Sequence, residues 1–243
     1  MSREQDRIRQ KMEADPIREC NKVRQRYCPD LFQDFATTKD PRHLSYIDYT
    51  NKEMLGTMFY KGIAGISSMC SMTYEFNREK VVGNLYHFLG ELEKDYLPHG
   101  VTLNEYLEKL EPSELQHVQQ KQVYEMIRRK SFDDARFGKK WLVIEDGTQT
   151  YSGSRRLNEG CLERHHKKGT EEETVNYHCD VLEAKIVFVF GERLIVSIAS
   201  EFIENNGEDA EAQRGMSEEQ RKQDCETKAF KRLARKKTLE NRE

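Results

Sequence analysis

Apolar residues recur at helical spacing through the first half of the chain. Between Lys52 and about Gly90 two sets are separated by a glycine-bearing stretch. The first is Met54, Leu55, Met58, Phe59, Ile63 and Ile66, and the second, again on one side of a helix, is Val81, Val82, Leu85, Phe88 and Leu89. Thr102 begins a short amphipathic helix, and Pro112 begins a longer one that runs to about Lys130. Residues 1–26 form a charged helix with a thin apolar stripe. The pattern therefore predicts an all-helical region over residues 1–138.

The hydrophobic period changes after residue 138. The compact apolar run 141–144, "WLVI", is typical of a strand that is covered on both faces. Two β-branched runs, 181–190 and 193–204, meet at Gly191-Glu192, which predicts a two-residue hairpin. Residues 150–172 lack periodicity and predict a loop, and Ser217 caps a last helix over 217–237. We therefore expect an α+β fold, with antiparallel strands and a C-terminal helix following the helical region.

Charge is distributed unevenly, although the formal net charge is only −3. Lys and Arg outnumber Asp and Glu by seven to three in residues 121–141 and by nine to four in residues 221–243. The acids lead by seven to one in residues 201–220. The local field, not the mean charge, attracts a polyanion, so these basic segments are compatible with a nucleic-acid partner.

Several sequence features favour a cytoplasmic location. The first twenty residues are charged throughout and do not resemble a signal peptide. No run of 18 apolar residues occurs, so no membrane span is expected. The six cysteines, at positions 20, 28, 70, 161, 179 and 225, include no CxxC pair. We expect reduced thiols and no structural disulfide.

A series of motifs in order resembles the insertion-sequence DDE transposases, whose catalytic domain has an RNase H-like fold. The motifs are "SFDDARFGKKWLVIEDGTQTYSGSRRLNEGCLERHHKKGTEEETVNYHCDVLEAKIVF", "SIASEFIENN" and "QDCETKAFKRLA", and the resemblance covers about residues 97–237. It implies that residues 1–138 are a DNA-end-binding region and that residues 139–243 are a partial RNase H-like domain. In "DGTQ", Asp146 is similar to the first catalytic aspartate of that family.

The resemblance also implies a chemistry and its limits. DDE transposases cleave DNA and transfer strands in transposition with two divalent ions, Mg²⁺ or Mn²⁺, held by carboxylates. The family's second Asp and its Glu have no counterpart in this chain, so we expect a truncated transposase in which Asp146 alone binds metal weakly and cleavage does not occur. The alternative is a non-catalytic fragment that occupies transposon terminal repeats, self-associates or pairs with a full-length transposase.

Basic side chains around the Asp146 strand are candidates for contacts with DNA phosphates. They are Arg128, Arg129, Lys130, Lys139, Lys140, Arg155, Arg156, Arg164, Lys167 and Lys168, with His165 and His166 beside them. Residues 152–168 are equally compatible with a solubilising surface loop. In the RNase H-like fold, the strand with the first Asp lies between the hairpin and a fourth strand. Without that fourth strand, the Asp146 strand would have an unpaired edge, so we expect residues 139–243 to be less stable than the helical region.

Other residues suggest alternative sites that the pattern supports less well. Cys161, His165, His166, His178 and Cys179 include zinc-ligand types, but their spacing does not match a zinc knuckle. Of the other acids, Glu201 and Glu204 belong to a solvated acidic loop, and Asp224 and Lys228 have the spacing of an exposed helical ion pair. Cys225, with Ala229 and Leu233, is predicted to lie in the core.

Overall fold

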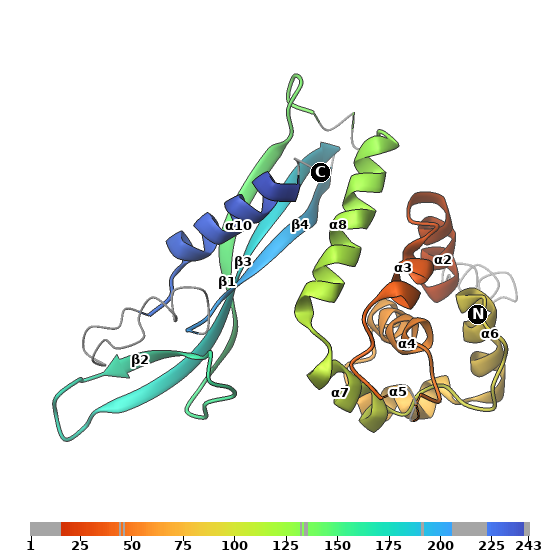
Figure 1. Cartoon of the computed structure of the whole chain (residues 1–243), viewed down its shortest axis with the longest axis horizontal. Coiled ribbons are helices and arrows are strands. Elements are labelled where there is room, and N and C mark those ends of the chain that lie inside the picture. The colour runs from red at the N-terminus through yellow and green to blue at the C-terminus, as the bar shows by residue number, and fades with distance from the viewer. Residues whose placement is uncertain are drawn as a thin grey trace, which may run out of the picture. The chain divides into compact units, whose positions relative to one another are not determined.

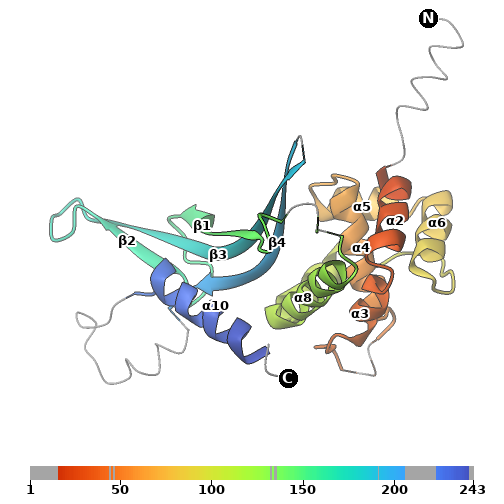
Figure 2. The same ribbon diagram turned by 90° about the horizontal axis from the view of Figure 1, so that it is seen from above.

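The protein is described by a computed structural model that covers residues 16–43, 45, 47–131, 133, 136–190, 192–205 and 223–240. It combines helices with an antiparallel sheet, as the α+β prediction requires. The chain divides into two compact units, Met1–Ser131 and Phe132–Glu243, which are drawn in Figures 1 and 2. Of the helix expected over residues 1–26, residues 1–15 lie outside the described residues, as does the Ser217 cap.

The first unit is helical throughout its described elements. Its helices are α2 (Pro16–Tyr27), α3 (Leu31–Thr37), α4 (Asn51–Ile63), α5 (Met69–Phe76), α6 (Glu79–Leu89), α7 (Gly100–Lys109) and α8 (Pro112–Arg128). Their apolar sides meet in one core that includes Met54, Leu85 and Leu103. The predicted start of α8 at Pro112 is confirmed. Helix α7 begins two residues earlier than predicted, because His99 Nδ1 accepts the Val101 amide and caps it.

Local chemistry explains where helix α4 begins and where α6 ends. Thr50 and Glu53 form a reciprocal capping box, in which each side chain accepts the other residue's backbone amide. Helix α6 ends at Gly90, whose φ of 67° is in the left-handed region that glycine adopts without strain. The first predicted apolar set, except for Ile66, therefore lies in α4 and the second lies in α6, and α5 occupies the stretch between them.

The second unit is an antiparallel sheet with one described helix. Its elements are β1 (Leu142–Gly153), β2 (Leu162–His166), β3 (Thr174–Phe190), β4 (Glu192–Ile203) and α10 (Glu226–Glu240). Strand β3 is central: β1 pairs along one of its edges, and β2 and β4 pair with successive parts of the other. The predicted pairing of the two β-branched runs is confirmed by the β3–β4 register, although Gly191 lies outside the described residues.

Helix α10 packs against the β3–β4 part of the sheet (Figures 1 and 2). Ala229 and Leu233 of α10 are buried against Leu182 and Ala184 of β3 and Ala199 of β4. The predicted core role of Ala229 and Leu233 is confirmed, whereas Cys225 is exposed and lies before the helix. The predicted helix over 217–237 is wrong at residues 223–225, which are not helical.

The predicted strand at 141–144 is confirmed as the start of β1, but its predicted coverage and the predicted loop over 150–172 are wrong. The side chains of Leu142, Val143 and Ile144 are 56%, 42% and 48% exposed, so this run is not covered on both faces. Among the described strands β1 pairs with β3 alone, and α10 packs on β3 and β4. The predicted loop over residues 150–172 contains the end of β1 and all of β2. Most residues of these segments are polar and exposed, so the sequence lacks the alternation of apolar and polar residues that indicates a strand.

Hydrogen exchange can measure how β1 is held. In an antiparallel strand with one partner, alternate backbone amides face that partner, so we expect slow and fast exchange to alternate along Leu142–Gln149. The matched reference is β3 between Val181 and Val187, where both edges are paired and every amide should be protected. Uniform strong protection along β1 would show that its second edge is also paired.

Candidate functional site

Asp146 lies near the middle of β1 and is exposed. Its register partner on β3 is Glu183, which is itself opposite Ser200 of β4. Glu145 is instead opposite Ala184, which is buried under α10. Because side chains alternate along a strand, Glu145 belongs to the face that α10 covers and Asp146 to the opposite face. The two adjacent carboxylates are therefore separated by the sheet.

The carboxylate across the strand from Asp146 already has partners. Glu183 forms an ion pair with Lys185, with 2.6 Å between Nζ and Oε2, and accepts a hydrogen bond of 3.3 Å from the Ser197 hydroxyl. Within the described part of the chain, no three His, Cys, Asp or Glu side chains are grouped to hold a metal ion. A pair of Mg²⁺ or Mn²⁺ ions needs several carboxylate ligands, so the described residues around Asp146 do not fit such a pair.

Gly147, next to Asp146, allows the first turn of α10 to approach β1. A Cβ atom built at Gly147 would lie 2.3 Å from Oε1 of Glu226, the first residue of α10. Helix α10 begins at Glu226, and Asp224 precedes it. The side chain at the start of α10 thus lies against a glycine of the "DGTQ" motif.

Asp224 and Glu201 form a buried ionic cluster with Arg232 of α10, and this corrects two predictions. Arg232 Nε donates to Glu201 at 2.9 Å, and its Nη2 donates to Asp224 at 2.5 Å. Glu201 is 8% exposed and Asp224 is 9% exposed, so neither is a solvated side chain. The predicted Asp224–Lys228 pair fails because Asp224 lies before the helix and points at Arg232. Partial burial raises the pKa of the neighbouring Glu204 carboxyl above its usual range.

The predicted DNA-binding residues fall into both units. Arg128 and Arg129, at the end of α8, each pair with Glu125, and Lys130 follows with a φ of 59°. In the sheet unit, Lys139 and Lys140 lie in a turn closed by the bridge between Phe137 and Lys140. These two groups are close in sequence, but each is placed only within its own unit.

The remaining basic residues gather at one end of the sheet. Gly153, at the end of β1, is opposite Tyr177 of β3, and Leu162, at the start of β2, is opposite the next residue, His178. The β1–β2 loop and the β2–β3 hairpin therefore begin at the same place on β3. They carry the exposed side chains Arg155, Arg156, Arg164, Lys167 and Lys168.

Some of these charges are held by neighbouring groups. The Arg156 guanidinium donates to the carbonyls of Asn158 and Glu159 at 3.2 and 2.8 Å, so it stabilises its own loop. Lys167 pairs with Glu172 across the hairpin turn. His165 contacts Glu173, which also accepts the Gly169 amide, and these two bonds lower the pKa of the Glu173 carboxyl. The basic end of the sheet is an ordered hairpin, not a featureless loop.

The predicted alternative of a zinc site is not assembled. His178 contacts Asp180, with 3.0 Å between Nδ1 and Oδ2, and His165 contacts Glu173. Cys161 and Cys179 do come together, with their sulfur atoms 3.2 Å apart. This pair was not foreseen as a pair in its own right. The available signal was that "GCLERHH" and "NYHCD" are two halves of one hairpin.

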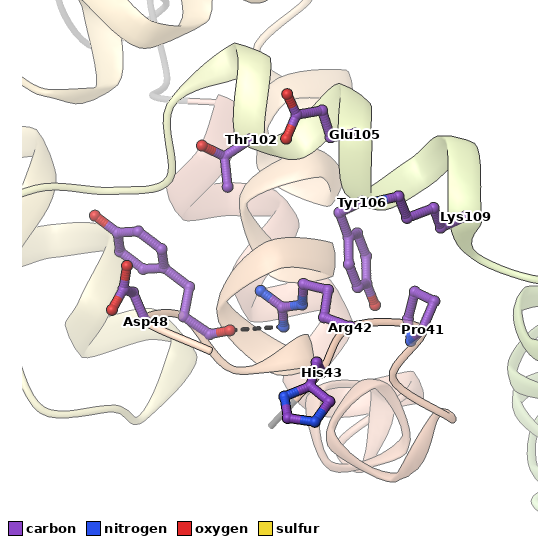
Figure 3. A pocket seen from close by; sticks show the side chains of 9 residues that line it. Pro41, Arg42, His43, Asp48, Thr102, Glu105, Tyr106 and Lys109 are labelled. Atoms are coloured by element: carbon purple, nitrogen blue, oxygen red, sulfur yellow. Dashed lines mark hydrogen bonds between the residues drawn. The ribbon is translucent and has the colours of Figure 1, made fainter. Parts of the chain in front are cut away.

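A hollow in the helical unit was not predicted from the sequence. It has a volume of about 380 Å³ and is lined by Pro41, Arg42, His43, Asp48, Tyr49, Thr102, Glu105, Tyr106 and Lys109. Figure 3 shows Arg42 within it, directed at the backbone carbonyl of Tyr49. Arg42 also forms two bonds with the Asp40 carboxylate and lies over the Tyr106 ring at 4.9 Å. The Arg42 side chain therefore links its own loop to Tyr106 of α7. The hollow is lined by both acidic and basic residues, so its charge does not favour one class of ligand.

Comparisons of the chain with protein-family models, curated protein sequences and solved structures each give no match. None of the described helices combines the length and apolar character needed to cross a membrane.

Proposed function

We propose that this protein binds DNA and is related to the insertion-sequence DDE transposases, with β1 as the strand that carries their first catalytic aspartate. The proposal is supported by the order of motifs around Asp146 and by three antiparallel strands, β1, β3 and β4, followed by a helix. This is the order that the first part of an RNase H-like domain requires. The fold and the family membership are parts of this proposal.

We infer that DNA binding, and not DNA cleavage, is the activity of the chain by itself. The observation that carries this inference is the surroundings of Asp146: its register partner Glu183 is engaged by Lys185, and Glu145 is on the other face. Basic side chains at the end of the sheet then supply the phosphate contacts. Such contacts release counterions that are condensed on DNA, and this release is less favourable at higher salt, so the affinity falls as the salt concentration rises.

A second candidate function is cleavage in partnership with a full-length transposase. The feature that favours it is β1, which pairs with β3 alone among the described strands and exposes Leu142 and Ile144. A strand edge of this kind accepts a further strand through backbone hydrogen bonds. Companion carboxylates brought by that strand would give Asp146 the partners that the described residues do not provide.

Salt-dependent binding to duplex DNA tests the first proposal. We expect the triple substitution Arg164→Ala, Lys167→Ala and Lys168→Ala to reduce the slope of log affinity against log salt by about 2 to 3, since each phosphate contact contributes about 0.9. Three exposed lysines of the helical unit, Lys22, Lys80 and Lys109, provide a control of equal charge change. An equal loss in both triple variants would show that binding is not localised to the hairpin.

Nicking assays with Mg²⁺ or Mn²⁺ separate the two functions. We expect the full chain alone to leave supercoiled DNA intact with either ion, and Asp146→Asn to bind DNA at least as tightly as the wild type because a negative charge is removed. Metal-dependent nicking that disappears in Asp146→Asn would contradict the inference of binding alone. Nicking that appears only after a full-length transposase is added, and requires Asp146, would favour the second candidate.

A further inference from the structure

Cys161 and Cys179 occupy opposite positions at the base of the β2–β3 hairpin. Leu162 is the register partner of His178, so one step outward along both strands places Cys161 opposite Cys179. Directly opposed residues in an antiparallel pair have Cα atoms about 4.5–5.5 Å apart. A disulfide spans about 4.4–6.8 Å between Cα atoms. The backbone register therefore suits a bond between these residues without rearrangement.

The side chains are already directed at each other. Their sulfur atoms are 3.2 Å apart, in a contact where either thiol can be the donor. Cys161 is fully buried and Cys179 is partly buried. The other four cysteines are elsewhere: Cys20, Cys28 and Cys70 belong to the helical unit, and Cys225 precedes α10. Cys161 and Cys179 therefore share their unit with no other cysteine except Cys225, which precedes α10.

Backbone contacts hold the Cys161 segment in place independently of the sulfur atoms. The Asn205 amide donates to the Gly160 carbonyl at 3.1 Å, and the Asn205 side chain donates to the Cys161 carbonyl at 3.3 Å. The Cys161 amide donates to the Asn158 carbonyl at 3.3 Å. Because the segment is ordered by these bonds, little conformational freedom remains to be lost when a covalent bond forms.

We propose that Cys161 and Cys179 are a reversible dithiol site, which an external disulfide such as glutathione disulfide converts to an intramolecular disulfide. The partly exposed Cys179 thiolate attacks one sulfur of glutathione disulfide and releases one glutathione thiolate. Cys161 then attacks the Cys179 sulfur of the mixed disulfide and releases the second glutathione. The protein loses two protons and two electrons, and the oxidant gains them as two molecules of glutathione.

The two thiols differ in how readily they ionise. Burial raises the pKa of the Cys179 thiol to about 11, and the neighbouring Cys161 adds to this effect. Burial opposes ionisation of Cys161 as well, but hydrogen bonds from the backbone at Asn158 and from Cys179 outweigh it and lower the pKa of Cys161. The first attack is therefore slow at neutral pH, and it accelerates as pH rises, because the thiolate is the nucleophile.

Disulfide formation would close a covalent ring around the β2–β3 hairpin, from Cys161 to Cys179. The ring encloses Arg164, Lys167 and Lys168. A cross-link stabilises a fold chiefly by restricting the unfolded chain. We expect oxidation to raise the melting temperature of the sheet unit by about 10 °C. This inference does not depend on the proposed DNA-binding function.

The test uses the full chain with Cys20, Cys28, Cys70 and Cys225 changed to serine, so that only the pair remains. The chain is equilibrated in buffers of increasing glutathione disulfide to glutathione ratio, quenched with acid, and analysed by mass spectrometry. We expect the loss of two hydrogen masses without a glutathione adduct, and full reversal by excess dithiothreitol. Proteolytic mapping of the wild type should yield one cross-linked peptide pair that contains residues 161 and 179.

The control carries one further change, Cys161→Ser, and should gain a single glutathione adduct at Cys179. Stable glutathione adducts on both cysteines of the four-serine chain, or thiols that remain reduced in glutathione disulfide alone, would overturn the proposal. If serine substitutions prevent folding, the same peptide map on the wild-type chain decides the question, because it needs no variant. A cross-link between any other cysteines in that map would also overturn it.

Discussion

Replacing Arg232 with alanine is expected to lower the free energy of unfolding of the sheet unit by about 3–5 kcal/mol. The Arg232 side chain is 10% exposed and donates to three acceptors: Glu201 of β4, Asp224 before α10, and the backbone carbonyl of Phe202. Removing the guanidinium takes away the cation that the two buried carboxylates share. Losing one partner of a buried ion pair costs more than losing one partner of an exposed pair.

Arg235→Ala provides the matched control for Arg232→Ala. Arg235 belongs to the same helix and is exposed, so its removal should change the free energy of unfolding by less than about 0.5 kcal/mol. Urea unfolding followed by the fluorescence of Trp141 measures both, because this is the single tryptophan of the chain and lies in the sheet unit. A loss near that of the control for Arg232→Ala would contradict the buried-cluster interpretation.

A double-mutant cycle identifies the source of the loss. Asp224 also accepts the backbone amides of Glu204, at 3.1 Å, and Cys225, at 2.9 Å, so Asp224→Asn retains part of its function as an acceptor. In the Arg232→Ala background, Asp224→Asn should therefore recover stability, since it removes a buried charge that has lost its Arg232 partner. In the wild-type background the same change should destabilise. Equal effects in both backgrounds would show that the two residues are not coupled.

The ionic cluster connects stability to the candidate site. Arg232 binds α10 to β4, and the first residue of that helix, Glu226, contacts Gly147 beside Asp146. The "DGTQ" motif is thereby held between β3 on one edge and α10 on one face. A larger side chain at position 147 would have to move the Glu226 side chain, whose carboxylate lies against the glycine. Loss of the cluster should therefore disturb the Asp146 strand without any change in a carboxylate at the site.

The spacing of apolar residues was sufficient to predict those helices and strands whose formation depends on nearby residues. The start of α8 at Pro112, the helical first unit and the pairing of β3 with β4 follow from spacing, capping and turn residues. Each of these depends on neighbours within a few residues, and sequence order contains that information.

Features that depend on distant partners were predicted poorly. The run 141–144 is apolar, but its exposure depends on which strands and helices pack nearby. Asp224 and Lys228 have the spacing of a helical pair, yet Arg232 and the β4 carboxylate Glu201 determine where Asp224 points. Cys161 and Cys179 are 18 residues apart and meet only because β2 and β3 pair. Tertiary context overrides local preference in all three cases.

Raising the pH from 10 to 12 is expected to unfold the helical unit. Tyr60, Tyr86 and Tyr106 are 0–1% exposed, and their hydroxyls donate to Asn21, to the Tyr96 carbonyl and to Asn51. Burial raises the pKa of Tyr60 and Tyr106 to about 12, and it raises the pKa of Tyr86 further. The folded state thus retains these phenolic protons at a pH where the unfolded chain has released them.

The sign of the effect follows from this difference in proton binding. A pKa that is raised on folding contributes stability that is complete below the ordinary value of about 10 and is lost as pH rises towards the folded value. A shift of two pKa units corresponds to about 3 kcal/mol for each tyrosine. Three such groups together approach the entire stability of a typical domain, which is about 5–15 kcal/mol.

Tyr60→Phe separates tyrosine ionisation from general alkaline damage. The variant loses the hydrogen bond to Asn21, about 1 kcal/mol at neutral pH, but it also loses a group whose ionisation favours the unfolded chain. Its helical circular dichroism should therefore disappear at a higher pH than that of the wild type, while Tyr124→Phe, at a 45% exposed position, should leave the midpoint unchanged. Tyrosinate absorbance recorded in parallel should rise together with the loss of helix. Helical signal that persists at pH 12, or a lower midpoint in Tyr60→Phe, would show that these three hydroxyls do not control alkaline stability.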